Sequence, residues 1–164
     1  MKTLYLVRHA KSSWKHKDLK DMERPLKKRG VKNAEFMSKL LKKGKNVPDI
    51  LISSPAVRAY NTAVIFAENF GIDGKDIIKN EKLYMADYDD FISVIEEIPG
   101  KINKTMIFSH NPGLTYFAST LGKTDIDNVP TCGVVRLDFD CERWNEIKTD
   151  NCKLVFFEFP KKYS

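Results

Sequence analysis

Short apolar segments alternate with longer amphipathic ones along this chain of 164 residues, and this alternation is the feature that most limits the possible folds. The periodicity predicts strands at 3–7, 49–53, 77–81, 105–109, 134–139 and 154–159, and helices at 29–43, 54–70, 89–98 and 112–121. Strands that alternate with helices of about ten residues or more indicate βαβ units. We therefore predict an α/β fold of three layers, a mostly parallel central sheet between two layers of helices, with the two last strands antiparallel to a neighbour or at a sheet edge.

The length and composition fit one globular domain that covers residues 1–164. Apolar residues make up 42% and charged residues 30%, which is an ordinary balance, and the sequence has no internal repeat or long linker. The 28 basic residues exceed the 22 acidic ones and give a net charge of +6. This excess favours anionic partners, although it is equally typical of a merely soluble surface.

The sequence also argues against membrane, secreted and metal-dependent proteins. Its apolar runs are at most five residues long, and Arg8 interrupts the apolar N-terminal segment before a secretory signal could form. The three cysteines, Cys132, Cys141 and Cys152, are odd in number and lack the spacing of metal ligands. We expect a cytoplasmic monomer with reduced thiols and no metal or other cofactor.

Basic side chains occur where three of the predicted strands end, and in parallel sheets ligands bind beyond these carboxyl ends. The first strand ends in Arg8-His9, within the sequence LYLVRHAK. The second leads into Arg58, with Ser54 as the predicted N-cap of the following helix, and the third leads into His110, with Asn111 as the predicted N-cap.

These strand ends predict an anion site. Neighbouring positive charges are unfavourable unless water or an anion stabilises them, and helix N-termini attract anions. Any one histidine is more often an ordinary core or surface residue, and His16 lies in a lysine-rich segment that is typical of a solvated loop. However, two of the three histidines and two arginines are predicted to meet at one edge of one sheet.

Four motifs resemble those of the histidine phosphatase superfamily: LYLVRHAKSSW at 4–14, DxxRPLxxRG at 21–30, SSPAVRAYNTA at 53–63 and FSHNPGL at 108–114. The resemblance extends from residue 4 to about residue 139. Within the superfamily, the chain resembles the compact phosphohistidine phosphatases of the SixA type. The resemblance implies a phosphoglycerate-mutase-like fold and a phosphatase that needs no metal.

The resemblance also implies a role for each matching residue. His9 would be the nucleophile that accepts the phosphoryl group, and Arg8, Arg58 and His110 would surround the phosphoryl oxygens. Arginine suits this role because its planar guanidinium binds several oxygens at once. Further hydrogen bonds to the substrate are expected from Lys11 and Ser12, in the loop after His9, and from the backbone N–H of Asn111. Asp21, Arg24 and Arg29 are expected first to form an ion network that holds the loop over the site, and only second to contact substrate.

The chain departs from the wider superfamily where many members carry a glutamate that protonates the leaving group. Met85 occupies the approximate position, and neither Glu81 nor Asp87 is in register with it. An alkoxide needs such an acid, whereas the imidazole of phosphohistidine is a better leaving group.

Three hypotheses follow for the function. The first is a phosphatase for phosphohistidine in a protein, and the second is a phosphatase for a small phosphorylated metabolite. The third is a non-catalytic module that binds phosphorylated ligands or polyanions. A nucleic-acid partner is not expected, because aromatic residues are not interleaved with the basic ones as in RNA-binding signatures.

Overall fold

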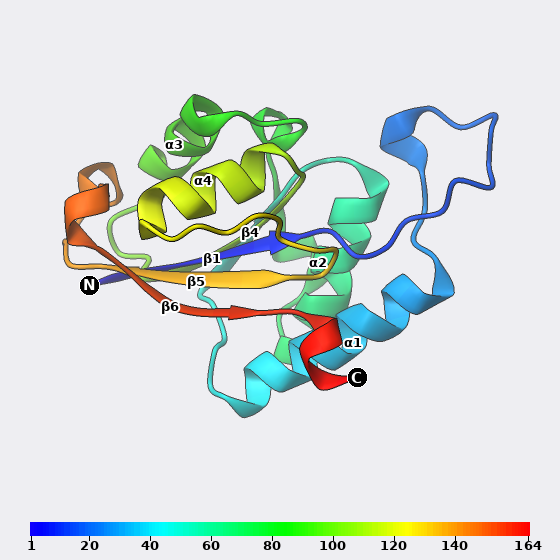
Figure 1. Ribbon diagram of the computed structural model, residues 1–164, viewed down its shortest axis with the longest axis horizontal. Coiled ribbons are helices and arrows are strands. Elements are labelled where there is room, and N and C mark those ends of the chain that lie inside the picture. The colour runs from blue at the N-terminus through cyan, green and yellow to red at the C-terminus, as the bar shows by residue number, and fades with distance from the viewer.

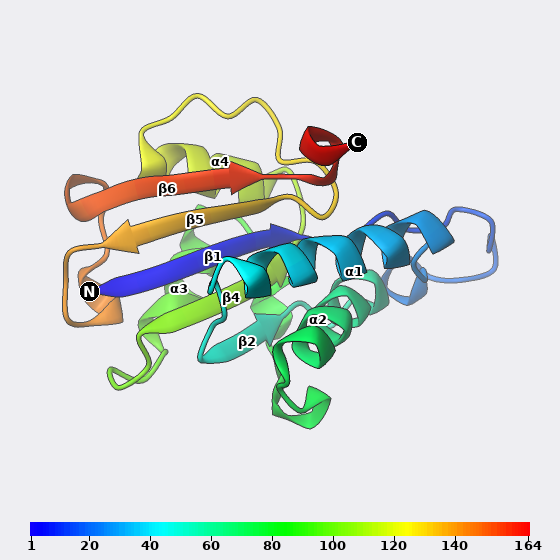
Figure 2. The same cartoon turned by 90° about the horizontal axis from the view of Figure 1, so that it is seen from below.

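A six-stranded sheet with the order β3-β2-β4-β1-β5-β6 forms the centre of the computed structural model, which describes residues 1–164. The strands are β1 (Lys2–Arg8), β2 (Ile50–Ser53), β3 (Ile78–Lys79), β4 (Lys104–Ser109), β5 (Val134–Phe139) and β6 (Cys152–Glu158). Adjacent strands are parallel from β3 to β1, whereas β5 is antiparallel to both β1 and β6. Only β5 therefore runs against the others (Figure 2), and the predicted, mostly parallel sheet is confirmed.

Helices cover both faces of this sheet, so that the predicted three layers are also confirmed. The helices α1 (Lys28–Lys43) and α2 (Val57–Phe70) pack on one face, and α3 (Tyr88–Glu96) and α4 (Gly113–Gly122) on the other (Figure 1). Each layer has its own core because the side chains of a strand alternate between the two faces. In β1, Leu4 and Leu6 join the core beneath α3 and α4, whereas Tyr5 and Val7 join the core beneath α1 and α2. None of these helices combines the length and apolar character that crossing a membrane requires.

Two helices begin later than the sequence predicts. Helix α2 begins at Val57 with Ala56 as its N-cap, so Ser54 does not cap it; the Ser54 hydroxyl is instead used in the turn, where it accepts a hydrogen bond from the amide of Ala56 at 3.2 Å. Helix α4 has Pro112 as its N-cap rather than Asn111. The Asn111 side chain still accepts from the Thr115 amide, at 3.2 Å, and thereby satisfies one amide of the first turn.

The third strand differs from expectation in its extent, whereas the two last strands fit the prediction of an antiparallel neighbour or an edge position. The third strand is limited to Ile78–Lys79, because it pairs only with the last two residues of β2 at the edge of the sheet. Strand β5 lies inside the sheet, and β6 forms the other edge. Since β6 runs parallel to β1, the carboxyl ends of β1, β2, β4 and β6 all lie at one edge.

Candidate active site

The carboxyl edge of the sheet brings four of the predicted site residues together. Arg8 pairs in register with Ser109, so His9 and His110 follow neighbouring strands at the same level, and their ring centroids lie 5.2 Å apart. Arg58 reaches the same place from the first turn of α2, which follows β2. Arg8, His9, Arg58 and His110 all line one pocket of about 350 Å³.

The His9 imidazole is buried and held in one orientation. Its Nδ1 lies 2.8 Å from the carbonyl oxygen of Ala10, so Nδ1–H donates there and the lone pair remains on Nε2, which has no hydrogen-bond partner in the protein. Burial lowers the pKa of His9 to about 4, and the charges of Arg58 and Arg8 add to this effect. The ring is therefore neutral near pH 7 and has a free nitrogen available for attack.

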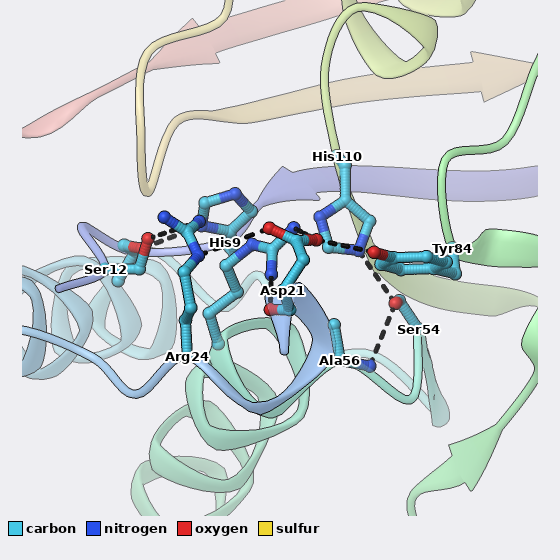
Figure 3. Close-up of polar contacts among 10 residues, drawn as sticks. His9, Ser12, Asp21, Arg24, Ser54, Ala56, Tyr84 and His110 are labelled. Carbon is cyan, nitrogen blue, oxygen red and sulfur yellow. Dashed lines mark hydrogen bonds and ion pairs between the residues drawn. The ribbon is translucent and has the colours of Figure 1, made fainter. Parts of the chain in front are cut away.

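The His110 imidazole is also buried and neutral. Its Nε2 lies 2.8 Å from the hydroxyl oxygen of Ser54, and that hydroxyl has no other acceptor for its proton, so Ser54 donates and the His110 proton resides on Nδ1. Burial lowers the pKa of His110 to about 3. Nδ1 is buried without a partner, on the side of the ring that faces His9 (Figure 3). His110 thus presents an unused donor beside His9.

The two predicted arginines are fixed by oxygen atoms of the protein. Arg8 donates from Nη1 to the carbonyl oxygen of Val129 at 3.1 Å. Arg58, which is only 4% exposed, donates from Nη1 to the backbone oxygen of Asp21 at 2.7 Å and from Nη2 to its Oδ2 at 3.0 Å. The Nε atoms of both arginines are buried without a partner. Both guanidinium groups are thus pre-oriented around the pocket and keep donors that no protein group uses.

Asp21 and Tyr84 complete the pocket, and sequence reasoning did not place either of them in contact with the predicted phosphoryl-binding residues. The Tyr84 hydroxyl donates to Asp21 Oδ2, and its ring packs edge-on against His110 (Figure 3). This hydrogen bond and the charge of Arg58 lower the pKa of Asp21, while the same bond raises the pKa of Tyr84. Asp21 is therefore ionised at neutral pH, and neither group is set up to release a proton there.

Arg24 is more closely involved in the site than the expected loop network implies. It is buried, donates from Nη2 to the Ser12 hydroxyl at 3.0 Å and lies with Nε 3.3 Å from Asp21 Oδ1. The exposed Trp14 ring covers it, with the guanidinium carbon 3.5 Å from the ring centroid. Arg29 takes no part in this network: it is exposed on α1 and forms no ion pair, so that part of the prediction is wrong. From its position on α1, the Arg29 side chain lines a neighbouring pocket instead of contacting Asp21.

The three residues expected to donate to the substrate all line the pocket. The Ser12 hydroxyl accepts from Arg24, as described above, and its own proton has no acceptor in the protein. The side-chain amide of Asn111 donates to the carbonyl oxygen of Val129 at 2.9 Å and to Asn128 Oδ1 at 3.0 Å, whereas its backbone N–H, the donor that was predicted, forms no hydrogen bond within the protein. Lys11 forms no ion pair, so its ammonium remains available.

A carboxylic acid suited to protonating a leaving group is missing from this pocket. Met85 lines it and is 56% exposed. Glu81 lies in a separate short 3-10 turn, and Asp87 caps α3 by accepting from the Asp90 amide at 2.9 Å. Asp21 is thus the only carboxylate that lines the pocket, among four cationic side chains.

This arrangement combines a neutral nucleophilic nitrogen with several fixed donors and a net positive charge. Such a site suits phosphoryl transfer, in which negative charge spreads over three oxygens and catalysis depends on positioning and charge stabilisation. The protein contains no group of three or more His, Cys, Asp or Glu side chains that could hold a metal ion.

The model of the histidine phosphatase superfamily (branch 1) matches residues 4–92. An uncharacterized protein of Mycobacterium leprae (strain TN) is 30% identical over 169 residues, which cover 94% of this chain and 100% of that protein. A solved structure from Agrobacterium tumefaciens, provisionally named phosphohistidine phosphatase SixA, is 26% identical with a TM-score of 0.82 and covers 97% of this chain and 98% of that one. The structure of protein histidine phosphatase SixA complexed with tungstate is 17% identical, covers 99% of each chain and shares the fold with a TM-score of 0.83.

Proposed function

The chain belongs to the histidine phosphatase superfamily (branch 1), a family of phosphatases, and from this premise we propose that it hydrolyses phosphohistidine in a protein through a phosphoryl group carried on His9. The observation that carries the proposal is the state of His9. Its ring is buried and neutral, its Nδ1 is held by the Ala10 carbonyl, and its Nε2 is free beside two arginines.

In the first step, the lone pair on His9 Nε2 attacks phosphorus, and the bond between phosphorus and the substrate nitrogen breaks. The departing imidazole keeps the electron pair of that bond and takes a proton from solvent. Arg8, Arg58 and the Nδ1–H of His110 face the oxygens on which charge develops. These fixed cations and donors supply the charge stabilisation, so the proposed step needs no metal.

In the second step, water attacks the phosphorus of phospho-His9 and releases inorganic phosphate. While the phosphoryl group is on Nε2, the proton on Nδ1 makes the ring cationic, and the Ala10 carbonyl 2.8 Å away stabilises this charge. A cationic ring is a good leaving group, so His9 returns to its neutral form when the phosphorus–nitrogen bond breaks and the water proton goes to solvent.

The choice of phosphohistidine as substrate rests on the missing acid. Asp21 is held ionised by Tyr84 and Arg58, and no other carboxylate lines the pocket. A leaving group that needs enzymatic protonation would depart slowly, whereas the imidazole of phosphohistidine needs little help. The name of the Agrobacterium structure supports the same substrate class.

Turnover of three kinds of substrate tests the proposal: a histidine-phosphorylated protein, p-nitrophenyl phosphate and alkyl phosphates. We expect kcat/KM to be highest for the phosphohistidine protein and to be lower for alkyl than for aryl phosphates. Glu81→Gln and Asp87→Asn should leave aryl turnover nearly unchanged. A loss of roughly a hundredfold or more on alkyl substrates alone in either variant would identify that residue as the acid and remove the physical support for phosphohistidine. Efficient turnover of alkyl metabolites without phosphohistidine activity would favour a small substrate instead.

A further inference from the structure

A second pocket, of about 550 Å³, adjoins the active site and shares Arg8, Lys11 and Thr131 with it. Its other walls come from the N-terminal turns of α1, the loop before β5 and the segment that follows β6. This last segment reaches the pocket because β6 runs parallel to β1, which places the end of the chain near the carboxyl edge of the sheet (Figure 2).

The charged side chains that line the second pocket are all cationic. Arg8, Lys11, Arg29 and Lys161 line it, and none of the side chains in its walls is acidic. None of these four cations forms an ion pair, whereas five other lysines and three arginines of the chain do. Four unneutralised cations around one hollow repel one another, and an anion that enters would relieve this repulsion.

The polar atoms of the pocket are also suited to an anion. Arg8 uses Nη1 to bind Val129, and its Nε is buried without a partner. Lys11 is held through its backbone, since its carbonyl oxygen accepts from the Lys27 amide at 2.8 Å, while its ammonium has no acceptor in the protein. Arg8 and Lys11 therefore face two neighbouring spaces, and only one of these contains His9.

We propose that this second pocket binds another anionic group of the same substrate, held beside the phosphoryl group that is transferred. The inference rests on the proposed function, so the anionic group is the carboxylate of an Asp or Glu side chain near the phosphohistidine. A second phosphate on a small substrate has the same chemistry, and the experiment distinguishes the two sources. Arg29 and Lys161 supply the cations that serve the second pocket alone.

The test compares the double variant Arg29→Gln/Lys161→Gln with the matched control Lys42→Gln/Lys43→Gln. The control also removes two positive charges, from exposed residues at the far end of α1, the helix that contains Arg29. These residues lie roughly 20 Å from Arg29 along the helix. The substrates are a phosphohistidine peptide flanked by Asp, the same peptide flanked by Asn, p-nitrophenyl phosphate, and a sugar phosphate with one or two phosphates. Measurements at low salt keep screening small.

For the Asp-flanked peptide, we expect KM to rise roughly three- to tenfold in the test variant, with kcat unchanged, as losing two exposed ion pairs would cause. The Asn-flanked peptide and p-nitrophenyl phosphate should keep their KM, and the control variant should behave like the parent protein. Equal changes for the Asp and Asn peptides, or no change for any substrate, would overturn the subsite. A change confined to the doubly phosphorylated sugar supports the subsite and assigns it to a second phosphate.

The failure of the proposed function gives a different pattern. If neither peptide is hydrolysed while p-nitrophenyl phosphate is, the phosphohistidine proposal is wrong. The two sugar phosphates then decide the subsite by themselves. If the ratio of their KM values differs between the parent protein and the Arg29→Gln/Lys161→Gln variant, the subsite is supported; if the ratio is unchanged, the subsite is overturned.

Discussion

Arg58 donates from both terminal nitrogens of its guanidinium to one residue, Asp21, at 2.7 Å to the backbone oxygen and 3.0 Å to Oδ2. Asp21 belongs to the long loop between β1 and α1, and Arg58 belongs to the first turn of α2. The pair therefore fixes the loop to the helix and at the same time fixes the direction of an arginine that lines the pocket. Two further residues contact the same carboxylate: Arg24, three positions later in the same loop, and Tyr84, from the segment between β3 and α3.

The first prediction concerns the role of Asp21. Asp21→Asn should lower kcat/KM by roughly 10- to 100-fold, since it weakens the charge-assisted hydrogen bond from Arg58 and removes the ion pair with Arg24. The loss should be the same for aryl and alkyl phosphates, because Asp21 positions the arginines and does not protonate the leaving group. Asp18→Asn, in the same loop but without an ion pair, is the matched control. A loss that is much larger for alkyl phosphates would instead make Asp21 the proton donor.

The second prediction concerns the covalent step. Rapid quenching with radiolabelled substrate should trap the phosphoryl group on His9, because its Nε2 is the free nitrogen in the pocket. His9→Ala should abolish both turnover and labelling, while circular dichroism and thermal unfolding show that the fold remains. His110→Ala should still become labelled, although more slowly. Label found on His110 in the parent protein would show that the two roles have been assigned in the wrong order.

The third prediction concerns stability and pH. Burial lowers the pKa of His9 to about 4 and that of His110 to about 3, below the value of about 6.5 in an unfolded chain. Between these values the unfolded state binds more protons, so the free energy of unfolding falls as the pH falls, by about 2 kcal/mol per pH unit near pH 5 for the two histidines together. Urea unfolding at several pH values measures this slope. His110→Asn should reduce it by about half; an unchanged slope would contradict the burial of neutral His110.

The fourth prediction concerns Gly30, which lies within α1. Alanine normally favours helices over glycine by about 1 kcal/mol. Here a Cβ would lie 2.3 Å from the carbonyl oxygen of Lys11, so Gly30→Ala must displace the loop after His9. We expect both a lower free energy of unfolding and a lower kcat/KM. Gly74→Ala, where nothing lies within 4 Å of the added Cβ, is the control and should change neither. A stabilised Gly30→Ala protein with full activity would show that the loop is free to move.

Much of the fold and part of the pocket could be predicted because they depend on local patterns. The uninterrupted apolar run of β1 indicates a strand that is buried on both faces, and parallel strands bring their carboxyl ends to one edge. This reasoning is enough to predict that His9 and His110, about a hundred positions apart in the sequence, lie close together. Helix starts were less predictable, because the Ser54 and Asn111 side chains have partners in other segments that compete with capping.

The sequence alone therefore determined the layers, the direction of most strands and the edge at which the basic residues gather. Only the tertiary structure decided which partners the charged side chains of the site bind. Tyr84 and Asp21 are 63 positions apart and meet because a long loop folds back over the sheet edge. Arg29 and Lys161 line one pocket because the last strand ends near the start of α1. The periodicity of a sequence indicates which face of a helix or strand a side chain lies on. Contacts between loops depend instead on how the loops pack against distant elements, and no repeating pattern in a single sequence indicates that packing.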